Sequence, residues 1–250
     1  MTDEKGIAQS WYAIVYAGAL RSYLDHYSAM EDPKLEAMPS EGPDRAKLSS
    51  SLFVGENHED IAQEALRLVQ ILSGAAKIKE GPGNLNLLSV VAIYADGTSE
   101  KFPAIRVHLS VSRHYTHFIE EGRVKETFEK SVVVFALRYG TKYPQVIQVL
   151  RTLAQSDDWL GLCRVFEIIR DDLNANDPQR KKNGYEKVVQ RGWVTKSEMD
   201  SYKATVALYR HPKDDSKGSM MLDAAQNFIG RIIEGWLYEI AARANPPTTG

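Results

Sequence analysis

Residues 159–174 read WLGLCRVFEIIRDDLN, a run in which apolar side chains fall on nearly every face of a helix. A helix that is apolar all round belongs in the interior of a protein, so we expect this one to be the central, most buried helix. Ser156 is the expected N-cap of this helix, because serine is favoured at that position. Asp157 and Asp158 would lie in the first turn, where the helix dipole favours acidic side chains. The rest of the chain therefore has to supply elements that cover this helix.

Amphipathic helices are predicted on both sides of this run. Glu120–Tyr139 fits one long helix, and Pro144 stands at a favoured first position of the next. Thr195 and Glu198 form a capping-box pattern that opens another helix, and Ser219 is the predicted N-cap of the last one. The apolar stripe of that last helix comprises Leu222, Ala225, Ile229, Ile232, Ile233, Trp236, Leu237 and Ile240. These patterns predict a bundle of about five helices over residues 119–245, followed by a tail at residues 246–250.

The residues before this bundle are predicted to mix helices with a small sheet. The apolar start of residues 10–30 favours a helix over a strand. The Pro-, Gly- and Ser-rich residues 31–56 favour a loop, which is long enough to hide a short element. Asn57 is the expected cap of a helix that begins at His58 and stops at Gly74.

Strand signals follow that helix. Residues 75–79 are a short candidate strand, residues 85–94 form an apolar strand, and Asp96-Gly97 has the composition of a tight hairpin turn. The return strand, with Pro103 near its start, alternates Ile105, Val107, Leu109 and Val111 with Arg106, His108 and Ser110. We predict a small antiparallel sheet of two to four strands with one wet face, within a mixed α+β region over residues 1–118 that ends near His117–Glu121.

The length, charge and composition of the chain limit the class of protein to which it can belong. The chain has 250 residues, 31 Lys and Arg against 33 Asp and Glu, a formal net charge of −2 and 43% hydrophobic residues. These values exclude collagen-like, disordered and disulfide-scaffold proteins, and no apolar run approaches the ~18–20 residues of a transmembrane helix. Near-neutral charge argues against coating nucleic acid by bulk electrostatics. The single cysteine, Cys163, and a polar N-terminus without the features of a secretory signal favour the cytoplasm.

Common catalytic and cofactor motifs are missing from the sequence. There is no glycine-rich phosphate loop, no nucleophile elbow and no standard zinc motif, so we expect no cofactor. His114, His117 and Glu120 have a spacing that would place two imidazoles and a carboxylate around a metal on a helix. The predicted strand-to-helix junction falls at His114, so the helix that this spacing requires would not yet have begun there. A polar junction with partly exposed histidines is therefore the preferred interpretation.

Arg21 and His26 match the R-x4-6-H spacing of HEPN ribonucleases, helical proteins that pair these residues across a dimer to cut RNA. In such a site His26 would act as general acid–base and Arg21 would stabilise a pentavalent phosphate. About one such match is expected by chance in this sequence. The pair also lies outside the helical half, so the surface of an ordinary helix is the competing interpretation.

Charged residues cluster at two places in the helical half. Glu167 and Arg170 are three residues apart, beside Asp171 and Asp172, and form either a structural ion pair or the lining of a site. The second cluster is a basic patch of Arg180, Lys181, Lys182, Lys187 and Arg191, with Tyr185 and Trp193 between them. Basic side chains interleaved with aromatic rings suit stacking on nucleic acid, whereas a solvated loop explains them without a ligand.

The sequence over residues 159–240 resembles a widespread group of uncharacterised bacterial proteins whose helical C-terminal halves are HEPN-like. The resemblance is carried by Phe166-Glu167-Ile168-Ile169-Arg170-Asp171-Asp172, by Gly192-Trp193, by Arg210-His211-Pro212 and by Ala224–Trp236. It implies a bacterial cytoplasmic protein of a phage-defence or toxin–antitoxin-like system. It supplies no catalytic residues to transfer, and the connection between Ala204 and Arg210 is shorter here.

These observations favour a non-enzymatic binding or assembly protein of a bacterial cytoplasmic complex, whose partner is another protein or a second copy of this chain. The expected interface residues are Trp11, Tyr12, Tyr16 and Trp236, from the aromatic N-terminal segment and the apolar last helix. Two alternatives stay open at this point. One is a HEPN-like RNA-directed nuclease or its inactive relative, and the other is a nucleic-acid-binding accessory protein.

Overall fold

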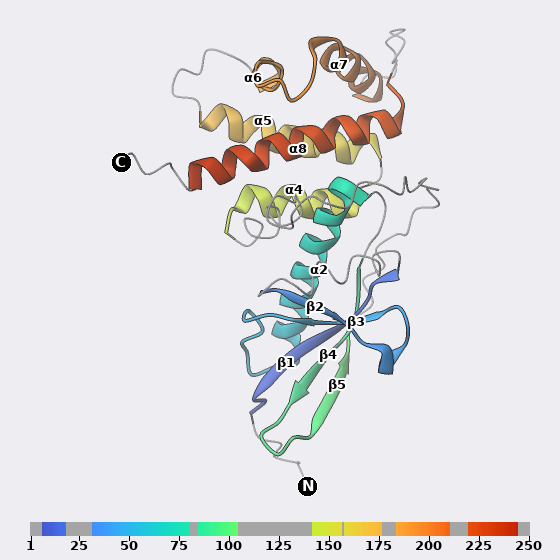
Figure 1. Cartoon of the computed structure of the whole chain (residues 1–250), viewed down its shortest axis with the longest axis vertical. Coiled ribbons are helices and arrows are strands. Elements are labelled where there is room, and N and C mark those ends of the chain that lie inside the picture. The colour runs from blue at the N-terminus through green and yellow to red at the C-terminus, as the bar shows by residue number, and fades with distance from the viewer. Residues whose placement is uncertain are drawn as a thin grey trace, which may run out of the picture. The chain divides into compact units, whose positions relative to one another are not determined.

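Five strands and six α-helices form over the residues that the structure describes. This computed structural model describes residues 7–18, 32–80, 85–104, 142–156, 158–176, 184–210 and 220–244. The strands are β1 (Ser10–Tyr16), β2 (Lys34–Ala37), β3 (Arg45–Ser49), β4 (Asn86–Ile93) and β5 (Ser99–Pro103), with a short 3₁₀ helix η2 (Pro39–Glu41). The α-helices are α2 (His58–Glu80), α4 (Pro144–Gln155), α5 (Trp159–Ala175), α6 (Gly184–Gln190), α7 (Lys196–Arg210) and α8 (Leu222–Ala244). The fold is α+β, as predicted (Figure 1).

The chain divides into two compact units, and the division falls inside α2. Residues 1–73 and 83–113 form the first unit, and residues 74–82 and 114–250 form the second. The expected boundary at His117–Glu121 and the long helix Glu120–Tyr139 lie outside the described residues. That boundary and the five-helix bundle therefore stay predictions. Among the described helices, none is long and apolar enough to cross a membrane.

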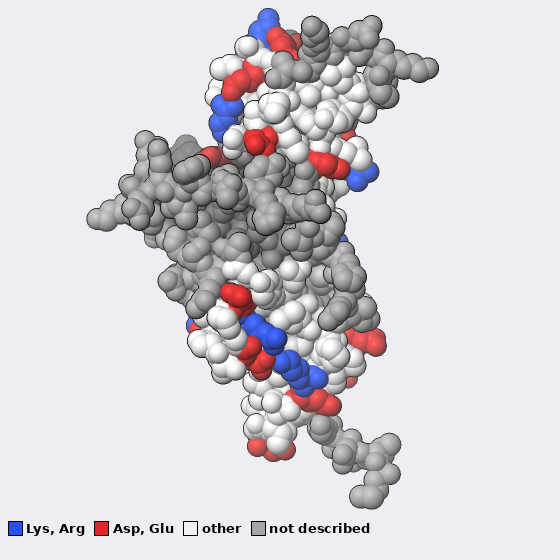
Figure 2. Space-filling view, turned by 90° about the vertical axis from the view of Figure 1, so that its right-hand side faces the viewer, with Lys and Arg blue, Asp and Glu red and all other residues white. Residues whose placement is uncertain are grey.

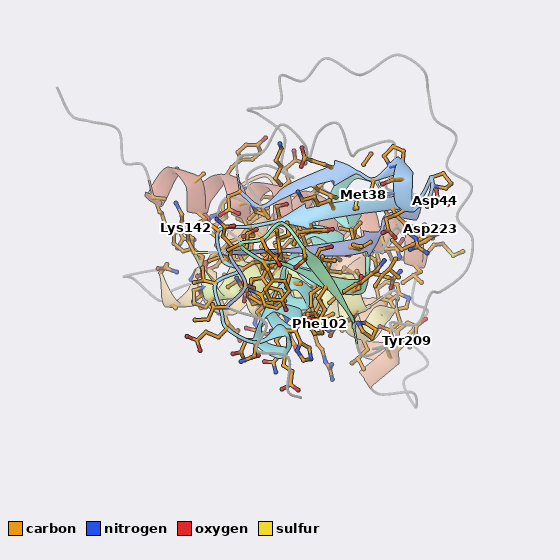
Figure 3. The ribbon with its side chains drawn as sticks, turned by 90° about the horizontal axis from the view of Figure 1, so that it is seen from below. Met38, Asp44, Phe102, Lys142, Tyr209 and Asp223 are labelled. Atoms are coloured by element: carbon orange, nitrogen blue, oxygen red, sulfur yellow. The ribbon has the colours of Figure 1, made fainter. Side chains whose placement is uncertain are left out.

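The first unit is built on an antiparallel sheet with the strand order β2-β3-β1-β4-β5. One face of this sheet, which we call the helix face, packs against α2. It carries one residue from each of the five strands, aligned across the sheet: Leu35, Leu48, Ala13, Val90 and Phe102. This face is turned toward α2, because the Phe102 ring stacks on His58 in the first turn of that helix, 4.3 Å between ring centroids (Figure 3). The core of the unit lies between this face and the apolar stripe of α2.

The opposite side of the sheet is the charged face, which carries Lys34, Glu36, Arg45, Lys47 and Lys101. These side chains are half-buried or exposed, which agrees with the wet face expected from the sequence. The described sheet has five strands, however, and not the two to four predicted. Its charged face is also not wet throughout, because Ile14, Ser89 and Val91 at the centre are buried.

The prediction of a helix at the start of residues 10–30 is wrong for residues 10–16, which form β1. This strand is in the middle of the sheet, and Ala13, Ile14 and Val15 are all buried although they alternate between its faces. A strand buried on both faces shows a continuous apolar run rather than alternation, and such a run cannot be told from a helix by its period. The remaining residues, 19–31, lie outside the described part.

Part of the predicted loop at residues 31–56 is a hairpin of β2 and β3. Ala46 and Leu48 of β3 are buried, whereas Arg45, Lys47 and Ser49 between them are half-buried, which is the alternation of a strand with one covered face. The Pro, Gly and Ser residues that suggested a loop fall outside this short strand, apart from Ser49.

Helix α2 begins as predicted, because the Asn57 side chain accepts a hydrogen bond from the Asp60 N–H at 2.9 Å. The predicted stop at Gly74 and the candidate strand at residues 75–79 are both wrong, since the helix continues to Glu80. Gly74 instead allows a close approach to α4. A Cβ atom there would lie 2.0 Å from the carbonyl oxygen of Leu150.

The hairpin of β4 and β5 confirms the predicted strand at residues 85–94 and the predicted turn at Asp96-Gly97. Gly97 has a φ of 80°, which favours glycine, and the Thr98 N–H donates to Asp96 Oδ1. The return strand lies earlier than predicted, because β5 ends at Pro103 rather than starting there. The predicted alternating residues 105–111 lie outside the described part.

The second unit is organised around α5, which contacts each of the other described helices of residues 142–244. Figure 1 shows α5 and α8 between α4 on one side and α6 and α7 on the other. The predicted capping box is confirmed, since Thr195 and Glu198 bond reciprocally at the start of α7. The N-cap of α5 is Asp158 and not Ser156, because the Asp158 carboxylate accepts from the Gly161 N–H.

Candidate partner-binding groove between α4 and α5

Several predicted site residues lie outside the described part of the chain. They are Arg21 and His26, the metal candidates His114, His117 and Glu120, and the basic residues Arg180, Lys181 and Lys182. The catalytic pair, the metal site and the centre of the basic patch therefore stay predictions. Among the described residues, no group of three His, Cys, Asp or Glu side chains is placed to hold a metal ion.

Lys187 does not present its charge to solvent, which corrects its assignment to the basic patch. Its side chain is 3% exposed, and Nζ donates to the Leu173 carbonyl at 3.1 Å and to Asn174 Oδ1 at 3.0 Å. The ammonium thus satisfies the C-terminal end of α5, where the helix dipole favours a cation. A phosphate contact by Lys187 would have to break these bonds.

Arg191 also forms contacts with other residues of the second unit. Its Nε donates to Glu239 Oε1 at 2.8 Å, and its guanidinium lies 5.6 Å from the centroid of the Trp193 ring. That ring packs against α8 so closely that a Cβ atom at Gly235 would lie 2.5 Å from it. Arg191 and Trp193 therefore fasten the α6–α7 connection to α8.

The predicted interface residues of β1 lie on different faces of the sheet. Trp11 is on the helix face, where its Nε1 donates to the Gly55 carbonyl at 3.1 Å. Tyr12 and Tyr16 are on the charged face, and Lys47 Nζ lies 5.0 Å from the centroid of the Tyr12 ring. Of the three, Tyr16 is the most open, with 43% of its surface exposed.

Trp236 is a core residue, which corrects its assignment to the interface. It is fully buried in the second unit, and its Nε1 donates to Asp172 Oδ2 at 2.8 Å. The same carboxylate accepts from Arg243 at 3.0 Å and from Asn176 at 3.0 Å. Asp172 thus joins α5 to α8, and the apolar stripe of α8 faces inward.

The charged cluster at residues 167–172 lies along a groove. Arg170 donates two hydrogen bonds to Asp171 Oδ1, at 3.0 and 2.9 Å. Partial burial acts to lower the pKa of Arg170, but these bonds outweigh it, and the pKa is raised above its ordinary value. Arg170 thus bonds to Asp171, whereas the partner expected from the sequence was Glu167, so that ion pair stays a prediction.

The groove runs between α4 and α5 and has a volume of about 600 Å³. Its lining comprises Gln145, Gln148 and Thr152 of α4 with Arg164, Glu167, Ile168, Asp171, Asp172 and Ala175 of α5. The α4 residues are spaced three and four apart, so they share the side of the helix opposite its buried stripe. The amides, hydroxyl, guanidinium and carboxylates supply both donors and acceptors of hydrogen bonds.

An exposed apolar surface adjoins this groove. Leu160, one turn before Arg164 on α5, is 59% exposed. Tyr209, near the end of α7, is 62% exposed, and its ring stacks on Trp159 with 5.3 Å between centroids. We call Leu160 the apolar end of the groove.

Of the residues that line the groove, the sequence singled out Glu167, Asp171 and Asp172 and none of those on α4. Gln145, Gln148 and Thr152 carry no signal of their own, because polar residues at this spacing occupy the solvent side of any amphipathic helix. Their importance depends on the helix that lies beside them. Comparisons with protein families, with curated proteins and with solved structures found no match to this chain.

Proposed function

We propose that this protein is a non-enzymatic binding or assembly protein, which takes up an amphipathic helix of a partner protein along the groove between α4 and α5. The observation that carries the proposal is the position of exposed Leu160, one turn before Arg164, at a groove lined by donors and acceptors. Large apolar anchors next to a polar lining are the usual composition of a protein-binding surface.

The form of the groove supports a helix as the occupant. Its two walls are helices, and side chains one turn apart line it on α4 and on α5. A bound helix could place an apolar side chain against Leu160 and a polar face against Glu167, Arg164 and the glutamines. The resemblance of residues 159–240 adds the expectation that the partner belongs to a phage-defence or toxin–antitoxin-like complex.

The test compares Leu160→Glu with Val54→Glu, which alters an apolar residue of the first unit that is 83% exposed. The tagged protein and both variants are purified from cells of the source organism, and bound proteins are quantified and cross-linked. We expect Leu160→Glu to remove the partner, Val54→Glu to retain it, and cross-links to reach α4 and α5. Equal retention by both variants, or cross-links confined to the first unit, would refute the proposal. Light scattering on the pure protein identifies a second copy as partner.

A further inference from the structure

The buried centre of the charged face is the starting observation. Helix α2 covers one side of this sheet, and a side of a sheet that no element covers is normally solvated. Yet on the charged face Ile14, Ser89 and Val91 are 1%, 2% and 3% exposed. These three residues are aligned on the neighbouring strands β1 and β4, so something covers the middle of the sheet.

Among the described residues, the connection between β2 and β3 is bonded to the far edge of this face. It contains η2, and the carboxylate of Glu41 in η2 accepts a hydrogen bond from Lys101 Nζ at 3.0 Å. Lys101 belongs to β5, at the edge of the sheet opposite to β2. A bond between Glu41 and Lys101 therefore requires the connection to cross the charged face.

Charge holds this crossing in place. Glu41 Oε2 accepts from Arg45 at 3.2 Å as well as from Lys101, so one carboxylate joins β3, η2 and β5. The hydrogen bond from Lys101 lowers the pKa of Glu41 below its ordinary value. Figure 3 labels Met38 and Asp44, which flank the connection, together at one end of the β2–β3 hairpin.

We propose that residues 39–44 form a charge-latched strap over the sheet, which opens locally without unfolding the first unit. Exposed ion pairs are individually weak and are screened by salt. A cover held by two such pairs through one carboxylate should open far more often than the core unfolds. Opening uncovers Ile14, Val91 and the hydroxyl of Ser89. This inference does not depend on the proposed function, since it concerns the first unit alone.

Cysteine labelling tests the strap directly. Cys163 is the chain's one cysteine and is buried, so Cys163→Ala gives a background free of thiols. Ser89→Cys then reports opening of the strap, and Ala92→Cys on the helix face reports any wider unfolding. The maleimide labelling rate is measured under native conditions, with Glu41 intact and as Glu41→Gln. Glu36→Gln is the matched control, because Glu36 pairs with Lys34 on the same face but outside the strap.

We expect Glu41→Gln to speed labelling at position 89 by roughly threefold or more, and high salt to act in the same direction. Labelling at position 92 should stay unchanged, and Glu36→Gln should leave both rates as they are. An unchanged rate at position 89 overturns the strap, and so does an equal rise at both positions. If Ser89→Cys fails to fold, Val91→Cys serves as the reporter on the same face.

Discussion

Ser89 is a buried polar residue whose hydroxyl forms no hydrogen bond, within the described structure, that would offset its loss of contact with water. Ser73 in α2 is buried to the same degree, but its hydroxyl accepts from the Leu85 N–H at 2.9 Å. Leaving a buried polar group unpaired costs about 1–3 kcal/mol, whereas a typical satisfied bond adds about 1 kcal/mol. These two serines therefore have opposite effects on the stability of the first unit.

We predict that Ser89→Ala raises the free energy of unfolding by about 1 kcal/mol, because it removes a desolvated hydroxyl. Ser73→Ala should lower it by a similar amount, since it leaves the Leu85 N–H without its acceptor. Urea unfolding followed by tryptophan fluorescence measures both variants. A loss of stability in Ser89→Ala would show that the hydroxyl has a partner.

At the scale of single helices, the crossing of α2 and α4 depends on one missing side chain. Gly74 brings the backbone of α2 against Leu150 of α4, and Lys77 Nζ, one turn further on, donates to the Ala154 carbonyl at 3.0 Å. The lysine supplies a cation and a donor at the C-terminal end of α4, where both are favourable. Residues 74–80 are thus fitted to α4 in both shape and charge.

The variant Gly74→Ala tests this crossing. In an exposed helix the change to alanine would stabilise by up to about 1 kcal/mol, because alanine has the higher helix propensity. Here the new methyl group meets backbone, and we expect a net loss of about 1–3 kcal/mol. Gly230→Ala in α8 is the control, since its Cβ atom would lie 3.4 Å from the Ile78 carbonyl oxygen. Thermal unfolding should separate the two variants, and equal melting temperatures would contradict the close crossing.

The first turn of α7 carries a stability contribution that depends on pH. Hydrogen bonds from the Thr195 backbone and from Arg231 lower the pKa of Glu198 from 4.5 to about 2. Because the folded pKa is the lower one, this contribution is complete above pH 4.5 and is lost as the pH falls toward 2. We predict that Glu198→Gln destabilises by about 1 kcal/mol near neutral pH, as expected for a lost cap on a partly exposed side chain. The gap between variant and parent should close on acidification, which unfolding curves across this pH range would measure, and a constant gap would contradict the assignment.

At the scale of the whole molecule, the features that could be predicted from the sequence were those that depend on residues close together in the chain. Asn57 and Thr195 cap their helices through neighbours three residues away, and the Asp96-Gly97 turn is equally local. Gly74 was misassigned because its reason lies in Leu150, distant in the chain. β1 was misassigned because its burial on both faces depends on strands that follow it.

In the candidate site, too, the features set by neighbouring residues could be predicted, and those that depend on distant residues could not. The charged residues of α5 could be singled out because they interrupt an apolar run, and Lys187 was misassigned because a sequence shows a charge but not its burial. On the part of the first unit seen in Figure 2, acidic and basic side chains lie next to one another, which the net charge of −2 alone does not predict.

The division of α2 between the two units has a practical consequence for dissecting the protein. Residues 58–73 belong to the first unit and residues 74–80 to the second, so the second unit is discontinuous in sequence. A fragment expressed from residue 114 onward would lack the turns that carry Gly74 and Lys77 and would leave part of α4 bare. At the crossing between residues 73 and 74, protease cleavage would likewise sever a helix rather than a linker. The two units should therefore be separable by genetic rearrangement, with residues 74–82 joined to the later ones, but not by simple truncation.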